Sequence, residues 1–149
     1  MKKGRAIRIV AVVAAVAVVL LCGLYAFGKS YFTDARVYEI NWGIELPGGM
    51  TELYSTGSEA SFGGDGFSYT VYEYDGGSGA FNDSLSAGPD AGAEYAVGEI
   101  LDALAVPESE CPDFTADYTW RSGSRPVDER DELYIIYQDG RLYIAESML

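Results

Sequence analysis

The pattern of apolar and polar residues divides this chain into two parts. Residues 9–28 form an unbroken apolar run that contains no charged side chain. A helix that crosses the hydrocarbon core of a bilayer needs about 20 such residues, so the run predicts a transmembrane helix. Four basic residues precede it, and no acidic residue occurs before Asp34. By the positive-inside rule, this asymmetry places the N-terminus in the cytoplasm.

Two other interpretations of the apolar run remain open. A cleaved secretory signal has a shorter core of roughly 7–15 residues and a small-x-small site, for which the nearest match is Ala26-Phe27-Gly28. Lipidation of Cys22 would require small residues before it, where this chain has Leu20-Leu21. The sequence therefore favours a single-pass signal anchor in the cell membrane. Its parts are a basic cytoplasmic tail at 1–8, a transmembrane helix at 9–28, a connector at 29–36 and an extracytoplasmic domain at 37–149.

Strict alternation of apolar and polar residues predicts several short strands in the domain. Ile40, Trp42, Ile44 and Leu46 alternate with polar residues or glycine and predict a half-buried strand over residues 39–46, which Pro47 ends. Similar patterns predict strands at 51–56, 67–74 and 114–121. Glycine-rich or charged composition predicts connecting loops at 57–66, 76–89 and 121–132.

The C-terminal segment predicts a β-hairpin. Residues 133–137 and 142–145 flank Asp139-Gly140, a dipeptide that suits a type I′ turn because both positions need positive φ. The turn sets three cross-strand pairs and places apolar residues on both faces of the hairpin. We therefore expect this hairpin in the centre of the sheet. The predicted pairs are Tyr137 with Leu142, Ile135 with Ile144, and Ile136 with Tyr143.

One amphipathic helix is predicted over residues 90–106. Its apolar stripe follows helical spacing and comprises Val97, Ile100, Leu101 and Leu104, with Glu94, Glu99 and Asp102 on the opposite side. Asp90 is a suitable N-cap and Pro107 ends the helix. We expect the stripe to face Ile40, Trp42 or the C-terminal hairpin. The predicted fold class is α+β: an N-terminal transmembrane helix, then a mainly antiparallel sheet of five to six strands with this helix packed on it.

Charge and composition exclude several functions. All 23 acidic residues lie at or after Asp34, and five arginines offset them, so the chain from Ser30 onward carries a net formal charge of −18. Such a surface repels nucleic acid and anionic lipid. The chain has no histidine, which excludes histidine-activated nucleophiles and the commonest zinc ligand. Residues 63–66 are glycine-rich, yet no basic residue lies between Arg36 and Arg121, so we predict a tight turn there and no nucleotide site. We therefore predict no catalytic residue, no cofactor-binding residue, no metal ligand and no cofactor.

Calcium is the one metal that the composition would suit, because oxygen ligands are abundant. Asp128, Glu129, Asp131 and Glu132 are clustered, but two arginines lie among them and no EF-hand spacing occurs. A solvated charged loop explains this cluster better than a calcium site does. Paired carboxylates for glycoside hydrolysis are also available in principle, although nothing singles out one pair.

Three tyrosines are candidate contacts for a partner. Tyr95 falls on the polar side of the predicted helix, while Tyr72 and Tyr74 share a strand face with Ser68 and Thr70. Exposed aromatic side chains are enriched at the energetic centres of interfaces. Burial in the domain's own core is the ordinary alternative for each of them.

Several short motifs resemble those of an uncharacterised family of small bacterial proteins, which carry an N-terminal anchor or lipid signal and one extracytoplasmic domain. The motifs are Trp42-x-Ile44-x-Leu46-Pro47-x-Gly49-Met50, Gly64-Asp65-Gly66, Pro112-Asp113-Phe114, and the two strands of the C-terminal hairpin. The resemblance implies no activity and carries over no functional residue. We expect a non-enzymatic binding or accessory module that meets an envelope protein or peptide. The alternative is a calcium- or small-molecule-binding domain, with a carboxylate-based hydrolase as a more distant one.

Overall fold

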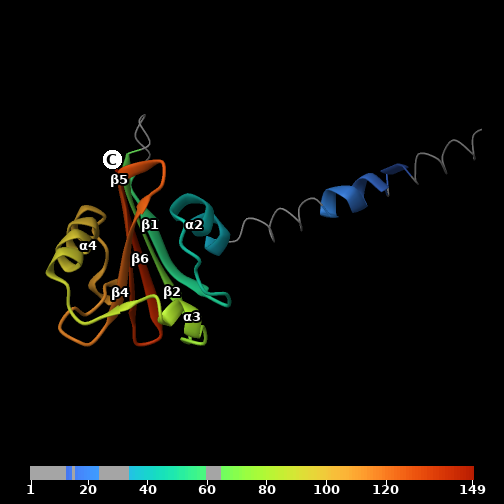
Figure 1. The fold of residues 1–149 in the computed structure, drawn as a ribbon. Coiled ribbons are helices and arrows are strands. Elements are labelled where there is room, and N and C mark those ends of the chain that lie inside the picture. Colours follow the sequence, from blue (N-terminus) through green and yellow to red (C-terminus); the bar gives the residue numbers. More distant parts are fainter. Residues whose placement is uncertain (1–12, 15, 24–33, 60–64) are drawn as a thin grey trace, which may run out of the picture. The chain divides into compact units, whose positions relative to one another are not determined.

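The computed structural model describes residues 13–14, 16–23, 34–59 and 65–149 (Figure 1). Residues 13–14 and 16–23 are helical, while the predicted cytoplasmic tail at 1–8 and the other residues of the predicted transmembrane helix lie outside the described residues. Within the described ranges, no helix combines the length and the apolar character that a membrane crossing requires. The chain separates into two units, Met1–Val37 and Tyr38–Leu149, and the second contains the whole sheet.

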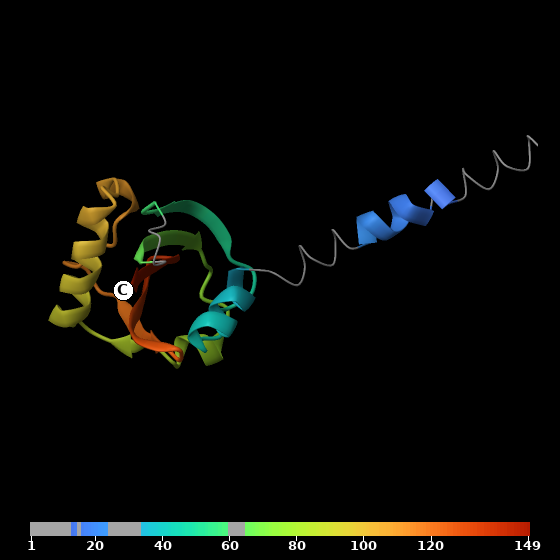
Figure 2. The ribbon, with the colours of Figure 1, turned by 90° about the horizontal axis from the view of Figure 1, so that it is seen from above.

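The second unit is α+β, built on an antiparallel sheet of six strands as predicted. The strand order is β1-β2-β6-β5-β4-β3. The helix α4 lies on one side of the sheet, and the end of α2 lies with α3 on the other side (Figures 1 and 2). The strands are β1 (Thr51–Gly57), β2 (Gly66–Glu73), β3 (Ser86–Ala87), β4 (Thr119–Arg125), β5 (Asp128–Gln138) and β6 (Arg141–Met148). The helices are α2 (Asp34–Trp42), α3 (Gly79–Asn82), α4 (Ala91–Ala103) and a short 3₁₀ helix, η1 (Glu108–Glu110).

The C-terminal hairpin is confirmed in its turn, register and position. Asp139 and Gly140 have φ values of 49° and 77°, the left-handed conformation that a type I′ turn requires. Strands β5 and β6 lie in the interior of the sheet. All three predicted cross-strand pairs are present: Tyr137 with Leu142, Ile135 with Ile144, and Ile136 with Tyr143.

The amphipathic helix is also confirmed. The Asp90 side chain caps α4 by accepting a hydrogen bond of 2.8 Å from the Ala93 backbone N–H. Val97, Ile100 and Leu101 are buried, as their helical spacing predicts, and Glu99 and Asp102 are exposed. The stripe packs on β2 and the C-terminal hairpin. It meets a cluster that contains Tyr69, Val71, Ile136, Tyr143 and Ala145.

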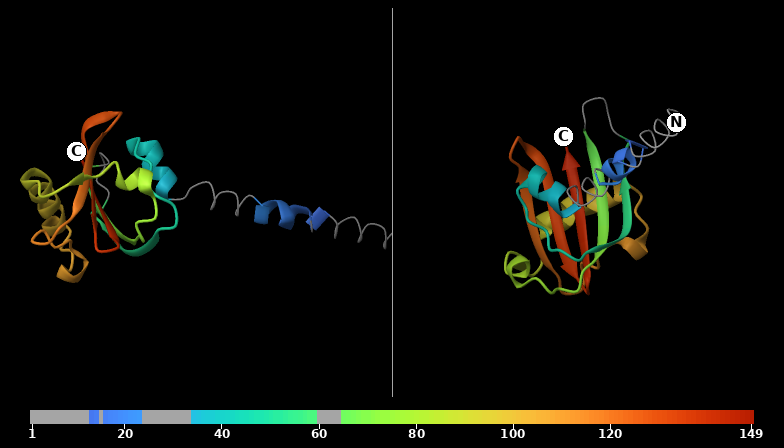
Figure 3. Two further views of the ribbon diagram at one scale, coloured as in Figure 1. Left: turned by 60° about the horizontal axis from the view of Figure 1, so that its bottom comes forward. Right: turned by 90° about the vertical axis from the view of Figure 1, so that its right-hand side faces the viewer.

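The predicted strand at 39–46 is wrong. Residues up to Trp42 belong to α2, which Gly43 ends with a φ of 63° and a hydrogen bond from its N–H to the Glu39 carbonyl. Ile40 is exposed and does not meet α4. Residues 44–48, which we call the extended segment, belong to no helix and pair with no strand. They run across the sheet face opposite α4, as the right-hand view of Figure 3 shows.

The alternation itself was informative from Trp42 onward. Trp42, Ile44 and Leu46 are all buried, whereas Gly43 and Glu45 are exposed. An extended segment shows a period of two whether or not its backbone joins a sheet. The pattern therefore identified which side chains are buried but not how the backbone hydrogen bonds are made.

Three loop or strand predictions also need correction. The charged stretch at 121–132 is not a loop, because β4 and β5 extend through it and pair down to Arg125 opposite Asp128. The predicted loop at 76–89 contains α3 and β3, and the strand predicted at 114–121 begins only at Thr119. Charge misled the prediction, because a charged residue is stable in a strand when its partner lies on the neighbouring strand.

Candidate binding pockets

Two of the three predicted contact tyrosines are buried. Tyr72 and Tyr74 are 4% and 2% exposed, while Tyr95 is 70% exposed on α4. Residues 69–72 of β2 are all buried, so both faces of the strand are covered there and the polar residues beside Tyr72 do not mark a solvent-exposed face. We therefore withdraw Tyr72 and Tyr74 as contacts. The partner role of Tyr95 remains a prediction.

Tyr74 has a clear structural role instead. Its ring packs edge-on against Phe81 and Tyr137, with ring centroids 5.8 and 5.4 Å away. Its hydroxyl accepts a hydrogen bond of 2.9 Å from the Ser78 backbone N–H. These contacts attach α3 to the end of the sheet.

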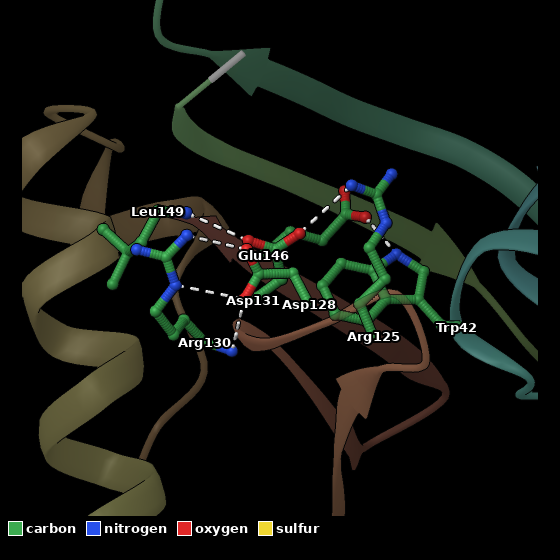
Figure 4. A network of polar contacts seen from close by, with 7 residues as sticks. All are labelled: Trp42, Arg125, Asp128, Arg130, Asp131, Glu146 and Leu149. Atoms are coloured by element: carbon green, nitrogen blue, oxygen red, sulfur yellow. Dashed lines mark hydrogen bonds and ion pairs between the residues drawn. The ribbon is translucent and has the colours of Figure 1, made fainter. Parts of the chain in front are cut away.

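The acidic cluster around residue 130 is engaged with arginines. Asp128 forms an ion pair with Arg130 at 2.7 Å, and Asp131 forms one with Arg125 at 3.1 Å (Figure 4). Hydrogen bonds from Arg130 lower the pKa of Asp128 to about 2. In the part of the chain that the structure describes, no three acidic or cysteine side chains gather as metal ligands would. The two aspartates are therefore used by the protein itself.

A second polar network attaches α2 to the sheet. Glu146 on β6 accepts a hydrogen bond of 2.8 Å from the Trp42 indole (Figure 4). It also accepts one of 3.4 Å from the Tyr38 hydroxyl and one from the Ser68 hydroxyl. Burial, and then the charge of Glu146, raise the pKa of Tyr38. All these groups are satisfied within the protein, so the network stabilises the fold and offers no free chemistry.

A pocket of about 490 Å³ lies at one end of the sheet, beside the β5–β6 turn. Its walls are largely aromatic and apolar, as in most ligand-binding pockets. Phe114 and Tyr118 pack edge-on, with ring centroids 5.6 Å apart. The pocket is lined by Ala87, Gly88, Pro89, Phe114, Thr115, Ala116, Asp117, Tyr118, Thr119, Tyr137, Gln138 and Asp139. We call it the aromatic pocket.

Two buried polar side chains fix the walls of the aromatic pocket. The Gln138 amide, 5% exposed, accepts from the Asp113 N–H at 2.8 Å and donates to the Asp113 carbonyl at 2.8 Å. The Tyr118 hydroxyl donates to Glu94 at 2.6 Å and accepts from the Asp90 N–H at 3.0 Å. Burial and the Glu94 bond raise the pKa of Tyr118. These bonds make the pocket rigid and leave its aromatic faces for a ligand.

Sequence reasoning placed no site at the aromatic pocket. It assigned residues 114–121 to a strand, although Pro112-Asp113 and Thr115 form a turn in which Asp113 accepts from the Thr115 N–H at 2.9 Å. Aspartate favours such turns because its side chain accepts from the backbone N–H two residues further on, so the turn was detectable. The meeting of this turn with the β5–β6 turn was not detectable, because it depends on strand order.

Searches of protein-family models, curated proteins and solved structures found no match to this chain. The resemblance to a family of small anchored bacterial proteins therefore remains a prediction.

Proposed function

We propose that this chain is a non-enzymatic binding module of the cell envelope, which uses the aromatic pocket to hold an apolar or aromatic group of an envelope protein or peptide. The observation that carries this proposal is a pocket with aromatic walls whose buried polar groups are already hydrogen-bonded to the protein. A ligand then gains binding free energy by covering apolar surface, and little ordering is needed because the walls are rigid.

The lining of the aromatic pocket supports binding over catalysis. Its buried polar side chains, Tyr118 and Gln138, serve as structural hydrogen-bond partners, and its two carboxylates, Asp117 and Asp139, are exposed to solvent. None of its lining residues is a cysteine, lysine or histidine. General acid–base chemistry needs a group whose proton is free to move to the substrate. A small molecule remains the alternative occupant, since a pocket of this volume lies within the range of about 300–1,000 Å³ that such ligands use.

The membrane part of the proposal rests on the sequence. An uncharged apolar run at 9–28 follows four basic residues, so we propose a single-pass protein with its C-terminal domain outside the cytoplasm. Alkaline carbonate extraction should leave the full-length chain with the membranes, and protease added to spheroplasts should digest the domain. A mature form that begins near residue 29, or lipid on Cys22, would contradict this arrangement.

The binding function is tested by selecting displayed random peptides on the full-length protein in lipid nanodiscs. Ala116 is exposed at the rim of the aromatic pocket, so Ala116→Trp should block it, whereas Ala103→Trp adds the same bulk at the exposed end of α4. We expect the selection to yield aromatic-rich peptides. These peptides should bind at least tenfold more weakly to Ala116→Trp than to Ala103→Trp. Peptides that bind both variants equally would place the interface elsewhere. Binding of aromatic fragments alone would favour the small-molecule alternative.

The calcium alternative has its own test. Asp128 and Asp131 are paired with arginines, so we expect no change in melting temperature when millimolar calcium is added, relative to magnesium. A marked increase with calcium alone would show that these ion pairs yield to the metal, and it would replace the binding-module proposal.

A further inference from the structure

A smaller pocket lies on the sheet face opposite α4, between the extended segment and α3. Its volume is about 280 Å³. It shares no lining residue with the aromatic pocket. The side chains and backbone that line it are Glu45, Leu46, Pro47, Gly48, Ser78, Ala80, Phe81, Ser84 and Arg121. We call it the Arg121 pocket.

The path of residues 42–46 over β4 places Arg121 in this pocket. Trp42 lies over Arg125, with the guanidinium carbon 5.8 Å from the ring centroid. Two residues after Trp42 and two before Arg125, Ile44 lies against Gly123, where an added Cβ would come within 2.9 Å of the isoleucine Cδ1. The next step of two residues in the same directions reaches Leu46 and Arg121, which line the same pocket. Residues 42–46 thus run antiparallel to β4, and the pocket lies where they reach Arg121.

Arg121 is half-buried and has no ion-pair or hydrogen-bond partner among the described residues. Three other arginines of the folded unit each have a carboxylate within 3.5 Å: Arg125, Arg130 and Arg141. A guanidinium carries five N–H donors and stays charged at any physiological pH. Removing part of it from water without a partner costs free energy, which a bound anion would recover.

Other groups in the Arg121 pocket fit an anion that carries an apolar body. The Ser78 hydroxyl is a second donor without a partner in the described structure, whereas the Ser84 hydroxyl already donates to the Phe81 carbonyl at 2.6 Å. Leu46, Pro47 and Phe81 supply apolar wall. A planar guanidinium binds a carboxylate through two parallel hydrogen bonds.

We propose that the Arg121 pocket binds the carboxylate of a ligand no larger than about one amino-acid residue, either a free small acid or the C-terminal residue of a peptide. Glu45 lines the same pocket, and the chain from Ser30 onward carries a net charge of −18. Both disfavour an anion with two charges, such as phosphate, more than one with a single charge. This site goes beyond the proposed function, because the aromatic pocket offers no cation.

The test is a titration of the full-length protein in nanodiscs, in which the NMR signals of the arginine side-chain N–H groups report binding. The probes are N-acetylphenylalanine and its neutral amide, a tetrapeptide that ends in phenylalanine with a free or amidated C-terminus, and inorganic phosphate. Arg121→Gln assigns the signal and removes the cation. Arg130→Gln makes the same charge change at an exposed arginine outside the pocket.

We expect both free carboxylates to shift the Arg121 signal in a saturable way and both amides to leave it unchanged. Affinity should fall at least tenfold in Arg121→Gln, stay within twofold in Arg130→Gln, and rise severalfold in Glu45→Gln. Tighter binding of the free tetrapeptide than of N-acetylphenylalanine identifies a peptide C-terminus, and equal affinities identify a free acid. Equal shifts with acid and amide, no shift with either acid, or tighter binding of phosphate would overturn the proposal. Because the readout is at Arg121, failure here leaves the test of the aromatic pocket intact.

Discussion

Two arginines on the same face of β4 have opposite environments. Arg125 forms an ion pair with Asp131 at 3.1 Å and lies over the ring of Trp42. Arg121, four residues earlier, has no such partner among the described residues and lines a pocket. The residue type, strand and face are the same. The difference lies in what crosses above and beside each arginine, so Arg125 stabilises the fold and Arg121 is available to a ligand.

The Arg125 end of β4 is a closed structural unit. Asp131 is only 4% exposed, and its second oxygen accepts a hydrogen bond of 3.0 Å from the Leu149 backbone N–H (Figure 4). One carboxylate therefore connects β4, β5 and the C-terminus. At the Arg121 end, Leu46 takes the place that Trp42 has beside Arg125, and no carboxylate of the described residues forms an ion pair with Arg121.

The largest effect should come from removing the buried carboxylate at the closed end. Asp131→Ala leaves the Arg125 charge and the Leu149 N–H without their partner, so we expect a loss of about 2–4 kcal/mol in the free energy of unfolding. Urea denaturation of the variant measures this loss. Asp128→Ala, at a solvent-exposed ion pair, is the matched control and should cost much less. Equal losses in the free energy of unfolding would mean that the buried ion pair of Asp131 contributes no more than the exposed pair of Asp128.

A second prediction concerns the close contact of Gly123, which lies between Arg121 and Arg125 on β4, with Ile44. An added Cβ at Gly123 would lie 2.9 Å from the Ile44 Cδ1, so Gly123→Ala should destabilise the domain by about 1–2 kcal/mol. Ile44→Val removes that methyl group, and the double variant should therefore lose less than the sum of the single changes. Gly98→Ala on α4 meets nothing within 4 Å and should stabilise the domain by about 0.5–1 kcal/mol. Strict additivity of the first pair in chemical denaturation would argue against this contact.

The fold was only partly predictable from the sequence. The β5–β6 hairpin and α4 were predicted correctly because local signals, Asp139-Gly140 and the Asp90 cap with its apolar stripe, determine them. The burial of Trp42, Ile44 and Leu46 followed from their alternation. Their backbone conformation did not, because Gly43 ends a helix where the pattern predicted a continuous strand.

The candidate sites were not predictable in the same way. Tyr72 and Tyr74 were expected to be exposed because they share a strand face with polar residues, yet both are buried, and residues on both faces of β2 are covered. Likewise, Arg121 and Arg125 look alike in a charged stretch that was predicted to be a loop. Their difference depends on the path of a segment about 80 residues away in sequence.

The smallest expected effect is on pH dependence at the closed end. Arg130 lowers the pKa of Asp128 to about 2 in the folded protein, below the ordinary value of 3.8. A carboxyl group with a depressed native pKa stabilises the fold fully above its unfolded pKa, and this contribution is lost as the pH falls toward 2. Asp128→Asn should therefore reduce the acid dependence of unfolding only below about pH 4. NMR titration of the Asp128 carboxyl carbon checks the native value, and a midpoint near 3.8 would contradict the pairing.

The contrast between the two arginines is tested most directly by comparing the unfolding free energies of Arg121→Gln and Arg125→Gln in the same buffer. Both variants remove one positive charge from the same face of the same strand. We predict that Arg125→Gln loses about 2–3 kcal/mol, because it leaves Asp131 buried without its cation. Arg121→Gln should stay within about 0.5 kcal/mol of the parent, because no partner is lost. Equal losses, or a larger loss for Arg121→Gln, would contradict the assignment of one arginine to the fold and the other to a ligand.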